Sequence, residues 1–205
     1  MKSSNFNSSP PLLLVVSGPS GAGKDYVLAQ LKRQHRDLIH IITTTTRECR
    51  PGEIDGVHYR FTNDAAFREM IASNELLEYA SVYGKWYGVP KKPVLEALAS
   101  GQDTLIKVDV QGAMTIRQCL PDAVLIFLVP PARGDLATRL ARRNTEQPDD
   151  LERRLKTADA EFETLPRFDY VIVNGEGQID RVLYEIEAII IAEKLRANPR
   201  HYQIP

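Results

Sequence analysis

A glycine-rich turn that ends in lysine carries the clearest chemistry in this sequence. Gly18, Gly23 and Lys24 have the spacing GxxxxGK, after the aliphatic run 12–16 and before apolar residues at helical spacing. Glycines in such a turn let backbone N–H groups point inward and cradle phosphate oxygens at a helix N-terminus. The lysine then reaches the β- and γ-phosphates of a nucleotide. The expected phosphate-binding residues are Gly18, Ser20, Gly21, Ala22, Gly23, Lys24 and Asp25.

Asp25 departs from the usual motif, in which a serine or threonine after the lysine gives a hydroxyl ligand to Mg²⁺. A carboxylate can also bind Mg²⁺, but it adds negative charge near the β-phosphate. Alternatively, Asp25 is an acidic residue in the first turn of a helix, where the helix dipole favours it. The sequence leaves these two interpretations open.

Two further patterns follow the turn. Residues 45–59 read TTRxxRxGExxGxxY, and residues 78–88 read EYA…GxxYG. Together with VDVQG at 108–112, Pro130-Pro131 and Arg154-Leu155, these patterns make the chain resemble guanylate kinase from about residue 12 to about residue 196. Several independent motifs in one order make the resemblance specific. It implies an α/β fold of the P-loop NTPase type, with a doubly wound parallel sheet, a β-rich NMP-binding insert and a helical lid.

The resemblance also implies how a nucleotide acceptor is held. Arg47, Arg50, Tyr59 and Tyr87 fall on the positions that bind the acceptor's monophosphate. Guanidinium groups and phenol hydroxyls are good donors to a dianion, and arginine can bind phosphate through two hydrogen bonds.

Glu78 falls on the residue that recognises guanine. A carboxylate can accept from both N1–H and the 2-amino group of guanine, whereas adenine presents no such pair of donors. Thr43, Val89 and Asp109 complete the expected GMP-binding set, although the family commonly has a hydroxyl donor where Val89 stands. Asp109 is also a candidate Mg²⁺ ligand, as is Asp25. Lys107 stands where the family usually has an acid, and we expect it to pair with Asp109, two residues along the same strand.

Three arginines are implied to close over the triphosphate as a lid: Arg139, Arg143 and Arg154. Phosphoryl transfer needs positioned positive charge and exclusion of water more than covalent chemistry from the protein. The expected transition-state residues are Lys24, Arg143 and Arg154, with Mg²⁺ bridging the donor oxygens. No general base is assigned, because the acceptor phosphate is already an anionic nucleophile.

Alternating aliphatic runs and amphipathic segments predict the elements that must position these residues. Continuous apolar runs such as 12–16 and 123–129 are typical of strands buried in a parallel sheet, and 179–196 has a helical pattern. We expect one domain over 12–205. Its core comprises 12–42, 91–132 and 156–197. Residues 43–90 form the NMP-binding insert, of which residues 43–60 are expected to be exposed and either irregular or β-rich. Residues 133–155 form the lid, and residues 1–11 form a mobile tail.

Composition excludes several function classes. The 205 residues carry 26 Lys and Arg against 27 Asp and Glu, so no basic excess predicts binding to nucleic acid or to an anionic membrane. Cys49 and Cys119 are too few and too isolated for a disulfide framework or a metal cluster. With no apolar segment long enough to cross a bilayer and no signal peptide, we expect a cytoplasmic protein that is a monomer or a homodimer.

The expected function is therefore ATP-dependent phosphorylation of GMP or dGMP. Two alternatives stay open. Asp25 also occurs in ribose 1,5-bisphosphokinases, which resemble guanylate kinase but lack much of the guanine site. A non-catalytic guanylate-kinase-like binding module would keep the fold without turnover.

Overall fold

The computed structural model describes residues 9–132, 134–136 and 157–203. Its larger sheet is five-stranded and entirely parallel, in the order β2-β7-β1-β8-β9. The strands are β1 (Leu13–Ser17), β2 (Ile39–His40), β7 (Thr104–Lys107), β8 (Val124–Val129) and β9 (Tyr170–Val173). β1 and β8 are buried along their whole length, as their uninterrupted aliphatic sequences predict.

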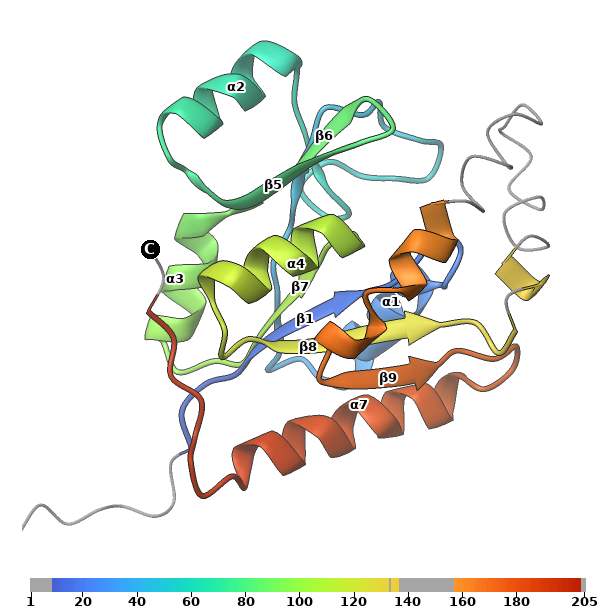
Figure 1. The fold of residues 1–205 in the computed structure, drawn as a ribbon. Helices are drawn as coiled ribbons and strands as arrows, with labels where there is room; N and C mark the ends of the chain where they lie inside the picture. The colour runs from blue at the N-terminus through green and yellow to red at the C-terminus, as the bar shows by residue number, and fades with distance from the viewer. Residues whose placement is uncertain (1–8, 133, 137–156, 204–205) are drawn as a thin grey trace, which may run out of the picture.

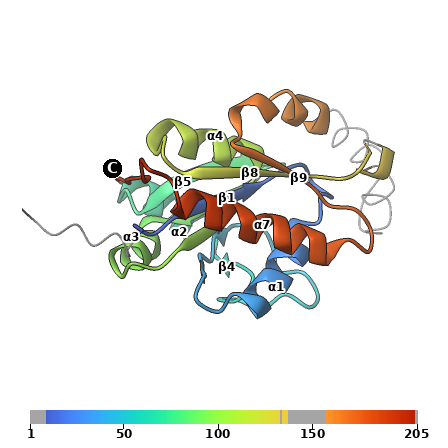
Figure 2. The ribbon, with the colours of Figure 1, turned by 90° about the horizontal axis from the view of Figure 1, so that it is seen from below.

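Helices cover both faces of this sheet, which confirms the predicted doubly wound α/β fold. The helices are α1 (Lys24–Gln34), α3 (Lys91–Ala99), α4 (Val110–Cys119) and α7 (Ile179–Lys194). α1 and α7 lie on one side of the strands and α4 on the other (Figure 2). Leu14 and Val16 of β1 pack with α1 and α7 in one apolar cluster, whereas Leu13 and Val15 belong to a second cluster with α3 and α4. Alternate residues of one strand therefore anchor two separate layers.

A second sheet lies beyond α4, at the top of Figure 1. It is four-stranded, in the order β4-β3-β6-β5, and all of its strands fall within residues 43–90. They are β3 (Thr44–Thr45), β4 (Arg60–Phe61), β5 (Leu76–Val82) and β6 (Lys85–Pro90), and α2 (Asp64–Ala72) accompanies them. Asn63 caps α2 through a hydrogen bond from the Ala66 N–H. The assignment of residues 43–90 as an NMP-binding insert stays a prediction.

One detail of this region follows from turn conformation and another differs from expectation. The β5–β6 turn lies at Tyr83-Gly84, where both residues have positive φ (50° and 75°), as a tight hairpin turn requires. Thr43, Thr44 and Thr45 are buried rather than exposed. Burial of Thr45 is tolerated because its hydroxyl donates to the Trp86 carbonyl at 2.8 Å.

The predicted lid, 133–155, lies almost entirely outside the described residues, as do Arg139, Arg143 and Arg154. On either side of it, residues 134–136 and 157–162 are helical, and a 3₁₀ turn follows at Leu165–Arg167. Within the described ranges, no helix is long and apolar enough to span a membrane.

Candidate active site

A cavity of about 400 Å³ lies where the carboxyl ends of the parallel strands face the smaller sheet. Ligands of open α/β sheets bind at this edge. Among the residues predicted from the sequence, thirteen line it: Gly18, Ser20, Gly21, Gly23, Lys24, Asp25, Thr43, Arg47, Arg50, Tyr59, Glu78, Tyr87 and Asp109. The fold thus brings the phosphate-binding turn and the predicted acceptor residues to one site.

The glycine-rich turn connects β1 to α1 and is packed against the sheet. Gly18 has φ 139°, and a Cβ there would come within 2.2 Å of the Leu128 carbonyl oxygen, so no other residue fits. Lys24 Nζ donates to the carbonyls of Gly18 and Pro19, at 2.5 and 3.0 Å. Ala22 is fully buried and does not line the cavity, because its N–H bonds to the Pro19 carbonyl as the turn closes.

The lysine shares its buried surroundings with acids. Burial lowers the pKa of the Lys24 ammonium to about 8, and the charges of Glu161 and Asp25 oppose that shift. Burial raises the pKa of the Glu161 carboxyl to about 7, and Lys24 opposes it. Glu161, which lines the cavity from the helical residues 157–162, was not singled out from the sequence. A bound polyphosphate would hold Lys24 in its charged form.

The predicted acceptor residues form a cluster of arginines and tyrosines that one acid, Glu53, orders. Arg47 forms two hydrogen bonds of 2.8 Å with Glu53, and its guanidinium lies 5.1 Å from the centre of the Tyr59 ring. The Arg50 N–H donates to the same carboxylate at 2.8 Å, and Tyr59 and Tyr87 pack edge to face. Glu53 belongs to the GE pair of the motif, and its function here is to orient Arg47.

Glu78 is a buried carboxyl that faces the deep end of the cavity. Its exposed fraction is 4%, and Oε2 has no hydrogen-bond partner among the described residues. Burial raises the pKa of this carboxyl to about 8, and the charge of Asp109 adds to the shift. A Cβ at Gly112 would lie 2.7 Å from Oε2, so the glycine makes room for the acid. Buried polar groups without partners are costly, which indicates a site built for a ligand that donates.

Val89 is the residue whose placement differs most from expectation. It is fully buried in the apolar cluster with α3 and α4, and it does not line the cavity. Along β6 the neighbouring residue Gly88 lines the cavity instead. Residue 89 thus contributes to packing between the two sheets.

Lys107 also pairs differently from the prediction. Its ammonium lies 2.5 Å from Asp25 Oδ1 and 2.7 Å from the Tyr59 hydroxyl, not on Asp109. Asp109 instead caps α4 by accepting from the Gly112 N–H at 2.8 Å, because the chain turns from strand to helix immediately after Lys107. Burial raises the pKa of the Asp109 carboxyl. Neither earlier interpretation of Asp25 anticipated this pairing with Lys107.

The family model for guanylate kinase matches residues 11–193 of the chain. The chain belongs to the guanylate kinase family. It is 41% identical over 193 residues to the guanylate kinase of Carboxydothermus hydrogenoformans, covering 94% of each chain. It is 42% identical over 206 residues to the chloroplastic/mitochondrial guanylate kinase 2 of Oryza sativa subsp. japonica, covering 97% of this chain and 72% of that one. The crystal structure of guanylate kinase from Anaplasma phagocytophilum matches with TM-score 0.76 at 29% identity, over 93% and 89% of the two chains.

Members of the guanylate kinase family transfer phosphoryl groups from ATP, which generally involves Mg²⁺, and the donor set of this cavity fits that ion. Mg²⁺ at a nucleotide takes one or two carboxylates with phosphate oxygens and water, rather than an all-protein cage. Asp25 and Asp109 line the cavity near the glycine-rich turn. Among the described residues no group of three or more His, Cys, Asp or Glu could hold a metal by itself.

One residue that supports the phosphate-binding turn escaped the sequence analysis. Asn174 follows β9 and is 7% exposed. Its Nδ2 donates to the Ala22 carbonyl at 2.9 Å, and a Cβ at Gly23 would lie 2.5 Å from the same nitrogen. A polar residue immediately after a buried strand, at the carboxyl edge of a parallel sheet, is the signal that could have found it.

Proposed function

We propose that this protein phosphorylates GMP or dGMP with ATP, giving GDP or dGDP, by in-line transfer of the γ-phosphoryl group. The observation that carries the guanine assignment is Glu78, a buried carboxyl in the cavity that also contains the phosphate-binding turn, with one oxygen that has no hydrogen-bond partner among the described residues. Its oxygens can accept from N1–H and the 2-amino group of guanine. Adenine would leave the acid without donors, so it is disfavoured.

The acceptor's phosphate is proposed to bind Arg47, Arg50, Tyr59 and Tyr87. Glu53 already holds Arg47 in a fixed orientation, which lowers the entropy that binding must remove. Thr43, 5% exposed, lines the same part of the cavity and has a hydroxyl to offer. Asp109 lies beside Glu78 and raises the pKa of the Glu78 carboxyl, so it tunes the guanine site electrostatically.

ATP is proposed to bind with its phosphates in the turn of Gly18–Lys24, near a second hollow of about 620 Å³. Tyr26, Pro131 and Gly175 line that hollow beside Gly21 and Gly23, which gives a nucleoside a place to extend. When bound, Mg²⁺ supplies positive charge to the β- and γ-phosphate oxygens, and Asp25 and Asp109 are its candidate ligands. Lys24, Arg143 and Arg154 are proposed to stabilise the transition state, with Arg139 as a further lid residue. No protein base is required.

The test is ADP release with ATP and Mg²⁺ against GMP, dGMP, AMP, UMP, CMP and ribose 1,5-bisphosphate. We expect turnover with GMP or dGMP to exceed AMP at least about 100-fold, because an unpaired buried acid costs 1–3 kcal/mol and guanine satisfies it twice. Turnover with the sugar bisphosphate alone would make Asp25 the better guide to the acceptor. GMP binding without turnover of any acceptor would indicate a binding module.

A further inference from the structure

Lys107 connects the two halves of the cavity. It is the last residue of β7, at the edge of the larger sheet. Asp25, one of its two partners, lies in the first turn of α1, directly after the phosphate-binding lysine. The other, Tyr59, belongs to the cluster with Arg47 and Tyr87. The ammonium thus lies between the turn proposed for ATP and the group proposed for the acceptor's phosphate.

Lys107 and Asp25 are buried to different extents, which distinguishes their ion pair from an ordinary surface salt bridge. The Lys107 side chain is 16% exposed and that of Asp25 is 67% exposed. The Asp25 carboxylate and the Tyr59 hydroxyl both accept from the Lys107 ammonium, which gives the half-buried cation two polar partners. An exposed ion pair contributes little to stability. The arrangement therefore holds a cation in the cavity between the phosphate-binding turn and the cluster of Arg47, Tyr59 and Tyr87.

The lysine also retains capacity to bind. An ammonium has three N–H donors. Among the described residues, Asp25 Oδ1 and the Tyr59 hydroxyl are its hydrogen-bond partners, so one donor remains. A phosphate that accepts from Tyr59 would come within reach of that donor, because the hydroxyl and the ammonium are 2.7 Å apart.

We propose that Lys107 is a binding residue for the acceptor's 5′-phosphate, and that Asp25 is the positioning residue that holds Lys107 there. This inference rests on the proposed function. It adds Lys107 to the residues that bind the acceptor, and it gives Asp25, the acid that follows Lys24, a role in positioning Lys107. Asp25 without Lys107 would repel the phosphates that meet in the cavity. The two side chains therefore act as a unit.

Equilibrium binding separates this proposal from a structural salt bridge. GMP and guanosine share the base and differ in the phosphate. In calorimetry without ATP, Lys107→Met should weaken GMP binding about 10- to 100-fold, the range for a hydrogen bond to a charged group, while guanosine binding changes less than about 2-fold. Lys107→Arg should retain GMP affinity within about 5-fold, because a charged donor remains.

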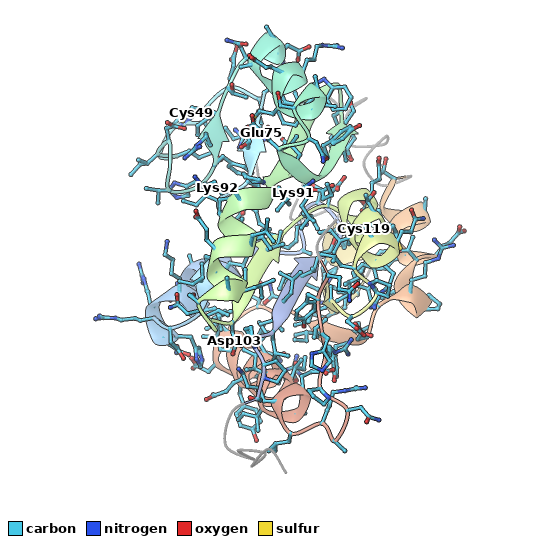
Figure 3. All side chains as sticks on the ribbon, turned by 90° about the vertical axis from the view of Figure 1, so that its left-hand side faces the viewer. Cys49, Glu75, Lys91, Lys92, Asp103 and Cys119 are labelled. Carbon is cyan, nitrogen blue, oxygen red and sulfur yellow. The ribbon has the colours of Figure 1, made fainter. Side chains whose placement is uncertain are left out.

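A double variant, Lys107→Met with Asp25→Ser, provides a second test in which the direction of the change in GMP affinity is predicted. Asp25→Ser added to Lys107→Met should restore part of the lost GMP affinity, because it removes a carboxylate that Lys107 no longer pairs and that repels the phosphate. The matched control is Lys194→Met. Lys194 bonds to Asp103 at 2.7 Å with side chains 28% and 18% exposed, and Asp103 lies far from Cys49 and the smaller sheet (Figure 3). This control should leave GMP binding unchanged.

The possible outcomes separate the role of Lys107 from the proposed phosphorylation of GMP. If the wild-type protein binds and phosphorylates GMP, but Lys107→Met weakens GMP and guanosine equally or weakens neither, the Lys107 assignment is overturned and the proposed function stands. If Asp25→Ser worsens the Lys107→Met variant, Asp25 does not act through Lys107, and the positioning role is overturned. If the wild-type protein neither binds nor phosphorylates GMP, the proposed function and this inference fall together.

Discussion

At the scale of single residues, burial without a partner is the property that most directly indicates function. Glu78 is held in an environment that raises its pKa to about 8, so the free protein at pH 7 keeps this carboxyl mostly protonated. Guanine offers two N–H donors, which favour the charged carboxylate. Binding should therefore lower the pKa of Glu78 and release a proton.

This linkage gives a prediction with a definite sign. GMP affinity should rise between pH 7 and pH 8, through the pKa of the free Glu78 carboxyl, where the phosphate is already largely dianionic. Glu78→Gln should remove the pH dependence and weaken GMP binding about 10- to 100-fold, because its amide keeps one accepting oxygen but turns an NH2 donor toward the second guanine donor. Calorimetry in buffers of different ionisation enthalpy measures the proton release directly.

Two controls sharpen the Glu78 measurement. IMP keeps N1–H but lacks the 2-amino group, so the preference for GMP over IMP should collapse in Glu78→Gln. Glu75→Gln, three residues earlier and exposed, should leave both affinities and the pH dependence as in the wild type. An unchanged preference for GMP over IMP in Glu78→Gln would contradict the guanine assignment.

At the scale of elements, the phosphate-binding turn depends on a strand distant from it in sequence. Asn174, after β9, donates to the Ala22 carbonyl from 152 residues away, and its own N–H donates to the Val129 carbonyl at 2.6 Å. Asn174, through its side chain and its backbone N–H together, therefore connects the phosphate-binding turn to the end of β8. A turn held in this way is preorganised for a polyphosphate.

Asn174→Ala should weaken ATP binding about 10-fold, because a buried carbonyl loses its partner and the turn loses its support. GMP binding measured without ATP should stay within about 2-fold, since Asn174 lines the second hollow and not the cavity that contains the predicted acceptor residues. Equilibrium titration with each nucleotide tests both expectations.

Asn63→Ala is the matched control for Asn174→Ala. Like Asn174→Ala, it removes a hydrogen bond between an asparagine side chain and the backbone, here the bond from the Ala66 N–H to Asn63 Oδ1 that caps α2. It should lower the free energy of unfolding by about 1 kcal/mol and leave ATP binding unchanged. Equal loss of GMP and ATP affinity in Asn174→Ala would show a general structural role instead.

At the scale of the whole molecule, the C-terminal residues 198–203 close the fold over the larger sheet. Arg200 forms two hydrogen bonds of 2.7 Å with Glu193, whose side chain is 1% exposed, and Tyr170 donates to the same carboxylate at 2.8 Å. The Leu13 N–H donates to the Tyr202 hydroxyl at 3.0 Å. The C-terminus is thereby connected to the beginning of β1.

Arg200→Met should lower the free energy of unfolding at pH 7 by about 3 kcal/mol, because it removes the nearest cation from the buried Glu193 carboxylate and leaves it the longer pair with Arg196, at 3.6 Å. Arg200 holds the pKa of Glu193 below its ordinary value. The stabilisation is therefore present above the unfolded-state pKa and lost as the pH falls through the folded-state pKa. The difference in free energy of unfolding between Arg200→Met and the wild type should accordingly become smaller at acidic pH.

Denaturant titrations at pH 7 and in acid measure this effect. The control is Lys92→Met, which removes an exposed pair with Glu96 (86% and 65% exposed, 3.8 Å) and should change stability by less than about 0.5 kcal/mol at both pH values. A difference between Arg200→Met and wild type that does not depend on pH would contradict the role of Glu193.

The sequence by itself determined the features that depend on local patterns. Uninterrupted aliphatic runs predicted β1 and β8, and the helical period predicted α7. The GxxxxGK turn with Asp25, together with the family resemblance carried by the motifs at 45–59, 78–88 and 108–112, predicted thirteen residues that line the cavity. The strands, the helix and the turn could be read in advance, because periodicity and turn conformation act between residues a few positions apart.

Only the tertiary structure decided which side chains meet across elements. Lys107 pairs with Asp25, 82 residues away, rather than with Asp109, because the chain turns at the end of β7 and Asp109 caps α4. Val89 lies in the core, and Asn174 reaches the phosphate-binding turn. Such contacts follow from strand order, crossover and helix packing, which bring distant segments together and leave no local pattern in the sequence.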